Sequence, residues 1–444
     1  MEFDASYRPA ERFRGKGSTE IKRIEKMKRR NKFYLLAGGC LLAAMMMVVS
    51  CSTKEDYPTP AEDLYSPDMA YTASDKGGVS PNGGGSSGED SQNGNTNAGI
   101  VTAAEWCDLM HWPFWSALML SEEFEDKSDY WKFYTNNRVA VKVTDAEGNA
   151  LAGINVKLLS EGDGAGTVWE TVTDNHGLAE CWLGMFQPAK ANADRLRVSV
   201  DGKVMNGHPM ICPLDSLMES VPVNEYVCKR PTPVTQQADI AFIVDATGSM
   251  MDEINFLKSD LMDIISHVEL VRPAMKMRTA ALFYRDQGDE YLTRHQNFSD
   301  DVASTLSFVE QQKADGGGDY PEAVHTALEK MLQELSWDKQ ARTRLAFLVL
   351  DAPAHYEDAV IRSLQQSVEL CAKQGIKLIP VAASGVDKNT EFMLRFFANA
   401  TGGTYVFLTD DSGVGYSHLK ASVGEYKVEQ LNQLLIRLIE YYTE

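Results

Sequence analysis

The sequence predicts a multidomain protein in which a β-sandwich domain precedes a larger, doubly wound α/β domain. Two observations carry this prediction. In residues 101–232, short stretches of alternating apolar and polar residues are separated by turns, as in DAEGNA. In residues 236–444, continuous apolar runs alternate with helical stretches. The first pattern is typical of sandwiches of short strands, and the second is typical of a parallel sheet covered by helices on both faces.

Residues 1–50 are predicted to be an N-terminal extension and a lipoprotein signal peptide. A basic segment, MKRRNK, precedes the apolar run Leu35–Val49, which is too short to span a bilayer but suits a signal-peptide core. The junction VVSC resembles the lipobox of bacterial lipoproteins, which implies that Cys51 is lipidated and becomes the N-terminus. An ordinary signal peptide that contains a cysteine is the alternative. Because the basic region of a signal should lie near the start, we expect translation to begin at Met27 rather than Met1.

The residues after Cys51 predict a location and a tether. STKED, with serine after the cysteine and acids close behind, resembles the surface-export signal of some Gram-negative lipoproteins. This resemblance implies an outer-membrane lipoprotein of the cell envelope that faces outward, with a periplasmic orientation as the alternative. Residues 51–100 contain few large apolar side chains, as in NGGGSSGED, and cannot bury enough surface to fold. We expect them to be a disordered tether.

The charge of the chain limits its partners. Without residues 1–50 it contains 32 Lys and Arg against 58 Asp and Glu, a net charge of −26. Such an acidic chain opposes binding to nucleic acid and to anionic headgroups. We therefore expect no nucleic-acid partner and contact with the membrane only through the lipid on Cys51. Cation binding and solubility are the natural interpretations of the charge.

Five cysteines follow Cys51, and none has the C-x-x-C spacing of a zinc site. Cys371 is expected to be a buried thiol on a helix. The other four permit disulfides outside the cytoplasm, in any of three pairings. They are Cys107, Cys181, Cys212 and Cys228.

The predicted sandwich rests on the alternation in RVAVKVTDAEGNALAGINVKLL and VWETVTDNHGLAECWL. These stretches resemble carboxypeptidase-regulatory or Ig-like domains, which implies a fold but no function. Just before them, EWCDLMHWPFWSALM contains four aromatic residues that either pack against the sandwich or stack on sugar rings. They are Trp106, Trp112, Phe114 and Trp115.

In the second domain, four apolar runs are predicted to be buried strands of a Rossmann-like sheet: 240–245, 277–284, 343–351 and 376–383. Ligands of such sheets bind at the carboxyl ends of the strands. Five oxygen-bearing side chains are expected there, on three loops, and they predict a divalent-cation site, with Mg²⁺ as the first choice and Mn²⁺ or Ca²⁺ as alternatives. They are Asp245, Thr247, Ser249, Asp319 and Asp351.

The segment DATGSM matches the D-x-[ST]-x-S signature, and Ala238–Glu444 resembles von Willebrand factor A (VWA) domains with a metal-ion-dependent adhesion site (MIDAS). The resemblance implies that Thr247 and Ser249 bind the cation directly, Asp245 directly or through water, and Asp351 through water. GGGD corresponds to GG-x-T of the family, so Asp319 stands where threonine is usual. The set DATGSM, YRD, GGGDYPEA and LDAPAH resembles a subgroup in which this aspartate is normal.

Other readings of these residues are weaker. No G-K-[ST] follows Ser249, which excludes a P-loop, and ATGSM is not the G-x-S-x-G elbow of a hydrolase with Asp351 and His355 as partners. A degenerate site without metal is a further alternative. Asp286 and Asp289 either line the site, with or without a second cation, or lie on a solvated loop, and the loop is favoured.

The resemblance implies a protein that binds a protein or extracellular ligand through the cation, for adhesion or assembly and without catalysis. A structural envelope scaffold and a metal-dependent hydrolase are the alternatives. Asp319 adds a hypothesis, since a third carboxylate should strengthen cation binding and weaken the grip on acidic partners. The alternative is that Asp319 points away or caps a helix that begins near Tyr320.

Overall fold

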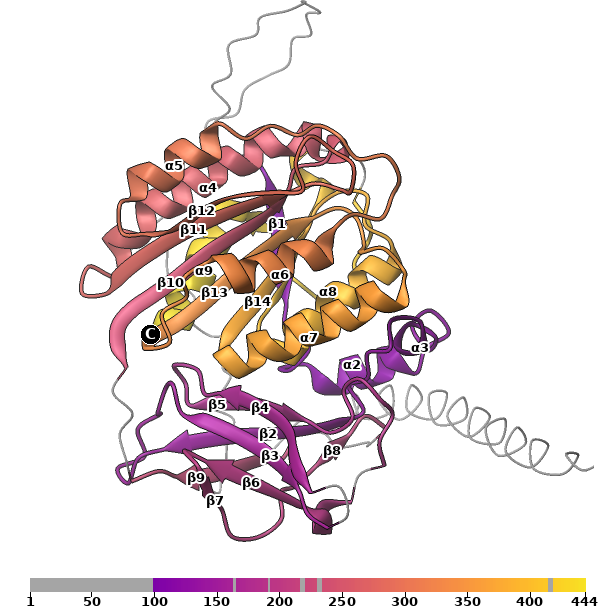
Figure 1. Cartoon of the computed structure of the whole chain (residues 1–444), viewed down its shortest axis with the longest axis vertical. Helices are drawn as coiled ribbons and strands as arrows, with labels where there is room; N and C mark the ends of the chain where they lie inside the picture. The colour runs from indigo at the N-terminus through magenta and orange to yellow at the C-terminus, as the bar shows by residue number, and fades with distance from the viewer. Residues whose placement is uncertain (1–98, 163–164, 191, 216–219, 230–233, 414–417) are drawn as a thin grey trace, which may run out of the picture. The chain divides into compact units, whose positions relative to one another are not determined.

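The computed structural model describes residues 99–444 except 163–164, 191, 216–219, 230–233 and 414–417 (Figure 1). The predicted signal peptide, Cys51 and the tether lie outside the described residues. Within the described part, no helix is both long enough and apolar enough to cross a membrane.

A mixed eight-stranded sheet dominates the structure. Its strands are β1 (Thr102–Trp106), β10 (Thr235–Asp245), β11 (Lys276–Tyr284), β12 (Thr293–Ser299), β13 (Ala341–Leu350), β14 (Ile376–Ala382), β15 (Tyr405–Leu408) and β16 (Glu429–Gln430). Their order is β12-β11-β10-β13-β14-β15-β1-β16. The strands from β11 to β15 in this order are parallel, whereas β12 and β1 pair antiparallel with their neighbours. The four predicted strands are confirmed, and the antiparallel strands were not predicted.

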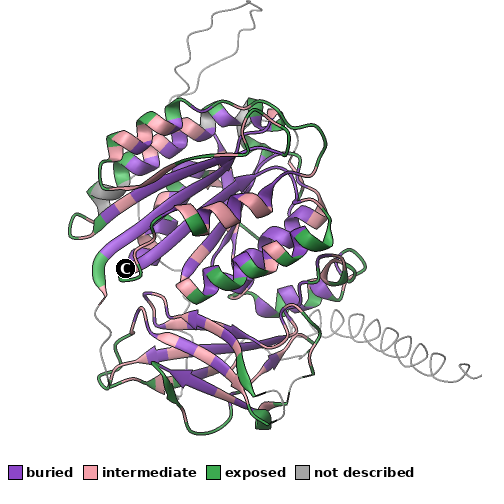
Figure 2. Ribbon diagram, viewed as in Figure 1, coloured by how far each residue is buried: buried purple, intermediate pink, exposed green. Residues whose placement is uncertain are grey.

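Helices cover both faces of this sheet, as a doubly wound fold requires (Figure 1). One face packs against α4 (Met251–Val271), α5 (Val302–Glu310) and α9 (Leu431–Thr443). The other packs against α6 (Val324–Glu334), α7 (Asp358–Gln374) and α8 (Lys388–Thr401). Successive residues of a strand point to opposite faces, so Phe242 and Ile243 of β10 belong to different cores. The central strands are buried along almost their whole length (Figure 2).

The chain enters the large sheet before it forms the small domain. Strand β1 lies between β15 and β16, which differs from the predicted domain that begins at residue 101. Two helices follow, α2 (Trp112–Met119) and α3 (Lys127–Trp131). Asp108 precedes them and forms a buried ion pair with Arg395 of α8, 2.5 Å between Oδ1 and the guanidinium nitrogen. The segment 102–131 is therefore fastened to the α/β part.

The four aromatic residues of this segment have different environments. Trp106, Trp112 and Trp115 are buried, whereas Phe114 is 37% exposed. Trp115 stacks on Phe392 of α8, with ring centroids 6.1 Å apart. The packing interpretation is therefore correct for the three tryptophans, which contact the α/β part as well as the small domain.

Two four-stranded sheets lie between β1 and β10 in the sequence. One has the order β5-β2-β8 with β9 beside β2, and the other has the order β4-β3-β6-β7. Val139, Val141 and Val143 of β2 and Val156 and Leu158 of β3 are buried in a common core, as the alternation predicted. The bounds are β2 (Asn137–Thr144), β3 (Asn155–Ser160), β4 (Gly166–Val172), β5 (Leu178–Trp182), β6 (Leu196–Val200), β7 (Lys203–Val204), β8 (Cys212–Pro213) and β9 (Val223–Val227). The Ig-like class stays a prediction.

Three of the cysteines are free thiols in the structure: Cys107, Cys181 and Cys371. Cys371 is buried on α7, as predicted. Burial raises the pKa of the Cys107 thiol to about 11, which keeps it protonated and unreactive near neutral pH.

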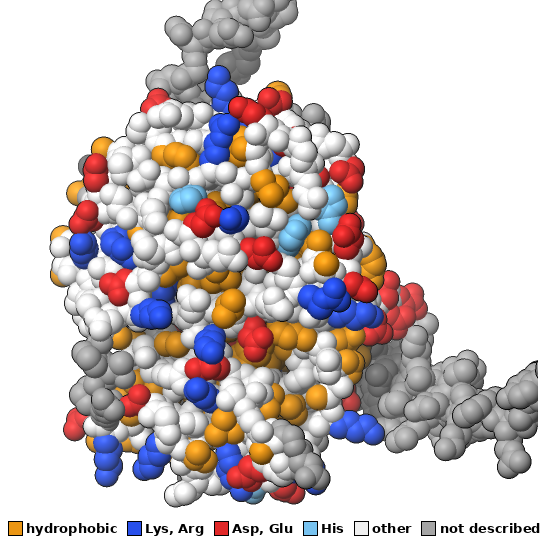
Figure 3. All heavy atoms as spheres, viewed as in Figure 1, with side chains coloured by type: hydrophobic (Ala, Val, Ile, Leu, Met, Phe, Trp, Pro, Cys, Tyr) orange, Lys and Arg blue, Asp and Glu red, His pale blue; other side chains and the backbone are white. Residues whose placement is uncertain are grey.

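On the face drawn in Figure 3, Lys and Arg side chains are interspersed with Asp and Glu. This face therefore shows no broad patch of a single sign.

Candidate metal site

The site begins where β10 ends. Asp245 is the last residue of this buried strand and has no exposed surface. The backbone N–H and the hydroxyl of Thr247 both donate to Oδ1 of Asp245, at 2.9 and 2.7 Å. The Thr247 hydroxyl lies 3.3 Å from that of Ser249. The signature thus folds its three oxygen-bearing side chains together, immediately before α4 begins at Met251.

Asp351 follows the last residue of β13, the neighbouring strand, and is also buried. Burial and the nearby charge of Asp351 raise the pKa of Asp245 to about 7. Oδ2 of Asp245 is buried and accepts no hydrogen bond within the described residues. Two buried carboxylates that repel each other and an acceptor without a donor are what a bound cation would compensate.

Asp319 differs from Asp245 and Asp351 in its exposure. The side chain is exposed on the loop between α5 and α6. Helix α6 begins at Val324 with Ala323 as its N-cap, so Asp319 does not cap the helix. The role of Asp319 as a metal ligand stays a prediction, since Ser249 of the signature is exposed as well.

Glu322, three residues later, is buried near the signature. It is 3% exposed, and its Oε2 accepts no hydrogen bond within the described residues. Burial raises its pKa to about 9, with further contributions from four carboxylates. These are Asp245, Asp286, Asp351 and Asp289. In the sequence this residue lies in a stretch predicted to be helical, so it was not predicted as a site residue.

Gly317 shows how close Glu322 lies to the signature. A Cβ at Gly317 would be 3.1 Å from Oε1 of Glu322 and 3.2 Å from Cβ of Thr247. Its φ of +72° is also a conformation that favours glycine. The backbone N–H of Glu322 donates to the carbonyl of Pro353 at 2.8 Å, which fixes the loop to the one that carries Asp351.

Asp286 and Asp289 complete the cluster after β11. Asp286 is buried, and its Oδ1 lies 2.8 Å from Nε2 of His355. Oδ2 of Asp289 accepts from the N–H groups of Gly317 and Asp286, at 2.9 and 3.1 Å. The interpretation as a solvated loop is therefore wrong for Asp286. His355 contacts Asp286, and this contact gives no support to a triad with Ser249.

Arg285 holds the backbone of the site. This buried side chain donates from Nε to the carbonyl of Ala246 at 3.1 Å and from a terminal nitrogen to the carbonyl of Lys313 at 2.9 Å. The N–H of Gly248 donates to the carbonyl of Gly316 at 3.0 Å. A Cβ at Gly248 would lie 2.8 Å from that oxygen, so the approach requires glycine. The loops are thus joined before any ligand binds.

These residues fit a hard divalent cation by the chemistry of their donors. Asp245, Thr247, Ser249 and Asp351 offer only oxygen atoms, as Mg²⁺, Mn²⁺ and Ca²⁺ prefer. In the described part of the chain, no three His, Cys, Asp or Glu side chains are arranged to hold a metal ion. A cation here would therefore depend on the hydroxyls as well as the carboxylates.

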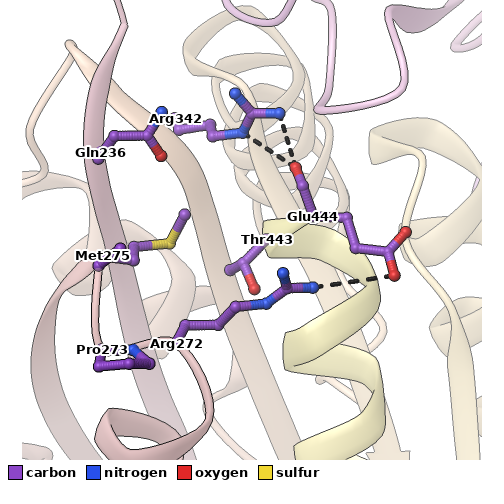
Figure 4. Close-up of a pocket in the computed structure, with 8 residues that line it drawn as sticks. Gln236, Arg272, Pro273, Met275, Arg342, Thr443 and Glu444 are labelled. Carbon is purple, nitrogen blue, oxygen red and sulfur yellow. Dashed lines mark hydrogen bonds and ion pairs between the residues drawn. The ribbon is translucent and has the colours of Figure 1, made fainter.

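A separate pocket of about 420 Å³ lies at the opposite edge of the sheet, where the parallel strands begin (Figure 4). Arg342 donates two hydrogen bonds to the backbone oxygen of Glu444, at 3.1 and 2.6 Å. Arg272 lies 3.8 Å from the Glu444 carboxylate. The pocket is thus closed on one side by residues of the chain itself and has no part in the carboxylate cluster.

The fold and this site together define a class: an open α/β sheet with an oxygen-lined signature at the carboxyl end of its first parallel strand. Residues 239–418 match the model of the von Willebrand factor type A domain. This part of the chain is a VWA domain, as the resemblance implied.

Two curated proteins share sequence with the chain. An ariadne-like RING finger protein of Acanthamoeba polyphaga mimivirus is 29% identical over 119 residues, which are 27% of this chain and 11% of that protein. The alpha-protein kinase vwkA of Dictyostelium discoideum is 24% identical over 202 residues, which are 45% of this chain and 32% of that protein. The chain thus spans about a tenth and a third of these relatives.

Three solved structures resemble it in part. BatB from Bacteroides thetaiotaomicron is 13% identical with a TM-score of 0.33, over 46% of this chain and 98% of its own. The pilus adhesin SpaC from Lactobacillus rhamnosus GG is 10% identical with a TM-score of 0.36, over 47% of this chain and 31% of SpaC. Proximal thread matrix protein 1 from the mussel byssus is 17% identical with a TM-score of 0.28, over 37% of this chain and 40% of the mussel protein.

Proposed function

We propose that this protein binds a protein or matrix partner through a divalent cation held by its VWA domain, in adhesion or in the assembly of a complex. Oδ2 of Asp245 is the observation that carries the proposal. It is buried and accepts no hydrogen bond within the described residues, while Oδ1 is fixed by two donors from Thr247. A bound cation would supply the missing partner at this point.

In this proposal the cation is Mg²⁺, with Mn²⁺ or Ca²⁺ as alternatives. Thr247 and Ser249 would bind it through their hydroxyls, and Asp245 and Asp351 would offset its charge. An open coordination position would then take an oxygen from the partner. The function is binding rather than catalysis.

The proposed location is the cell envelope, where the lipid on Cys51 holds the protein in the outer membrane with the folded part facing outward. The support is the order of a basic segment, an apolar run and VVSC in the sequence. Fractionation of cells tests the anchor. We expect the Cys51→Ala variant to leave the membrane fraction, and retention there would contradict the anchor.

The function is tested by capture of partners from the producing organism on the immobilised full chain, in magnesium and in chelator. We expect proteins that are retained with magnesium and released with chelator, and that are absent from an Asp245→Ala column. Capture that is equal in both media would instead indicate a scaffold that needs no metal. Magnesium-dependent hydrolysis in a substrate screen would argue for an enzyme.

A further inference from the structure

Two tyrosine rings form a partly exposed stack between the small helix α3 and a loop of the α/β part. Tyr356 lies in the loop between β13 and α7, which also carries Asp351, and Tyr130 lies on α3. The ring centroids are 3.9 Å apart, and the ring planes differ by 20°. Tyr356 is nevertheless 49% exposed. A stack covers one face of each ring, so much of the Tyr356 ring stays open to a ligand.

Trp131 holds the two rings in place. It is buried, and its ring meets both tyrosine rings edge-on, at centroid distances of 5.3 Å from Tyr130 and 6.1 Å from Tyr356. Its indole N–H donates to the carbonyl of Asn389 at 3.1 Å. The rings therefore need little ordering when a partner binds, which lowers the cost of binding.

The stack also has a structural role, because it joins α3 to the loop after β13. This role requires only the faces that the two rings share, and it does not explain why half of Tyr356 is left in water. Single exposed aromatic residues are ordinary in proteins. A preformed pair of rings is instead typical of binding surfaces, where tyrosine is enriched.

Acidic side chains flank both tyrosines. Residues 122–132 contain five acids against two lysines, and two more acids directly follow Tyr356. All seven acids are exposed, and Lys127 pairs with one of them at 3.1 Å. Burial, the neighbouring Tyr356 and the charge of Asp387 raise the pKa of Tyr130. The surroundings of the stack thus attract cations and repel acidic partners.

We propose that the stack of Tyr130 and Tyr356 binds an arginine side chain in a basic segment of a protein partner. The guanidinium would lie against the Tyr356 ring and pair with the neighbouring carboxylates. A cation over the face of a tyrosine ring is attracted by it. The chain makes this contact within itself, where the guanidinium carbon of Arg294 lies 3.9 Å from the centroid of the Tyr291 ring. A neutral ligand would gain nothing from the carboxylates, so a basic segment is the partner that this surface fits.

This inference goes beyond the proposed function and needs no cation. The stack adds a contact that a chelator does not remove, on the loop that carries Asp351. Its test is therefore made in chelator, where a failure says nothing about metal binding.

The test measures the binding of a labelled peptide to the full chain by fluorescence anisotropy in chelator. The probe is the blocked peptide Gly-Arg-Gly-Arg-Gly, and its counterpart contains glutamate in place of arginine. Tyr356→Leu removes the ring and keeps an apolar side chain, whereas Tyr356→Phe keeps the ring. Tyr426→Leu is the matched control, because Tyr426 is 42% exposed and follows the exposed acid Glu425 on another loop.

We expect the wild type, Tyr356→Phe and Tyr426→Leu to bind the arginine peptide with similar affinity. Tyr356→Leu should bind it about five-fold more weakly. The inference is overturned if the wild type does not bind the arginine peptide, if it binds the glutamate peptide equally well, if Tyr356→Leu behaves as the wild type, or if Tyr426→Leu loses as much.

A second variant keeps the test valid if thermal unfolding shows that Tyr356→Leu is not folded. Glu357→Gln combined with Asp358→Asn removes the two exposed charges that follow the ring and leaves the stack intact. Its affinity for the arginine peptide should also fall, and an unchanged affinity would overturn the inference.

A neutral sugar is the other ligand that stacked tyrosines could take. Maltose that binds to the wild type and not to Tyr356→Leu, while the arginine peptide does not bind, would contradict the inference and assign the stack to sugar. Partner capture that does not depend on magnesium would contradict the proposed function and leave these titrations unaffected. The two proposals can therefore fail separately.

Discussion

Two buried carboxylates, Asp245 and Glu322, distinguish this site from an ordinary polar loop. Each has an oxygen that accepts no hydrogen bond within the described residues, and the pKa of each is raised, first by burial. A carboxylate in this state is a cost to the fold unless a proton or a cation offsets its charge. The two residues therefore link the stability of the protein to pH and to metal.

The first prediction concerns this linkage. A carboxyl whose pKa is higher in the folded state than in the unfolded state holds a proton that unfolding releases, so its contribution to stability is lost as the pH rises through the folded value. In chelator, stability should therefore fall as the pH rises through about 7 for Asp245 and about 9 for Glu322. Thermal unfolding at a series of pH values measures this fall.

Glu322→Gln is the matched comparison for this prediction, since it keeps the shape of the side chain and cannot ionise. Its stability should fall less steeply with pH than that of the wild type, and saturating magnesium should flatten the wild-type curve. Identical pH profiles for the two proteins in chelator would contradict the prediction, because they would show that ionisation of Glu322 does not change the free energy of unfolding.

Among the elements, β1 and the segment after it are the least expected from the sequence. The sequence predicted four of the five parallel strands, all but β15, because each is a continuous apolar run, and it predicted Asp245 and Asp351 because they end such runs. Strand β1 is only five residues long and reads TAAEW, and its partners lie about three hundred residues away. A local sequence pattern does not predict a pairing between strands so far apart in the chain.

The same limit explains why the burial of Glu322 was not predicted. Asp319 and Glu322 both follow the glycines of GGGDYPEA, where the sequence predicts a helix that begins near Tyr320. The structure begins it at Val324, because the N–H of Glu322 bonds to Pro353 from a distant loop. That contact turns Glu322 inward, and Asp319 is left exposed.

The second prediction tests how firmly the N-terminal segment is fastened. Asp108→Ala removes one of the two carboxylates that pair with the fully buried Arg395, the other being Glu391, so the free energy of unfolding should fall by about 1.5–3 kcal/mol. Glu105→Ala is the control on β1, because its ion pair with Arg437 is partly exposed and should contribute less than about 1 kcal/mol. Denaturant unfolding of the full chain measures both, and equal losses would show that Asp108 is not needed to hold the segment.

At the scale of the whole molecule, the described residues belong to one compact unit rather than two independent domains. Strand β1 lies within the large sheet, and Trp131 of α3 donates to the carbonyl of Asn389 at 3.1 Å. The small sheets are thus inserted between a strand of the large sheet and the rest of it. The large sheet of this protein thus includes residues that precede the match at 239–418.

The third prediction follows from this insertion. A fragment of residues 236–444, the domain predicted from sequence, lacks β1 and leaves the edge of β15 unpaired and the apolar surface of α8 uncovered. We expect it to aggregate or unfold at a lower temperature, whereas residues 99–444 remain soluble and cooperative. Purification and thermal unfolding of the two fragments provide the comparison. Equal stability would mean that β1 is an accessory strand.

The most direct test of the central claim is a titration of the full chain with Mn²⁺ by calorimetry, for the wild type and for Asp245→Ala. The account predicts that the wild type binds the ion, that the variant does not, and that both unfold cooperatively in chelator. Mn²⁺ binding of equal affinity in Asp245→Ala would contradict the account, since the buried carboxylate at the end of β10 would then have no part in holding a cation.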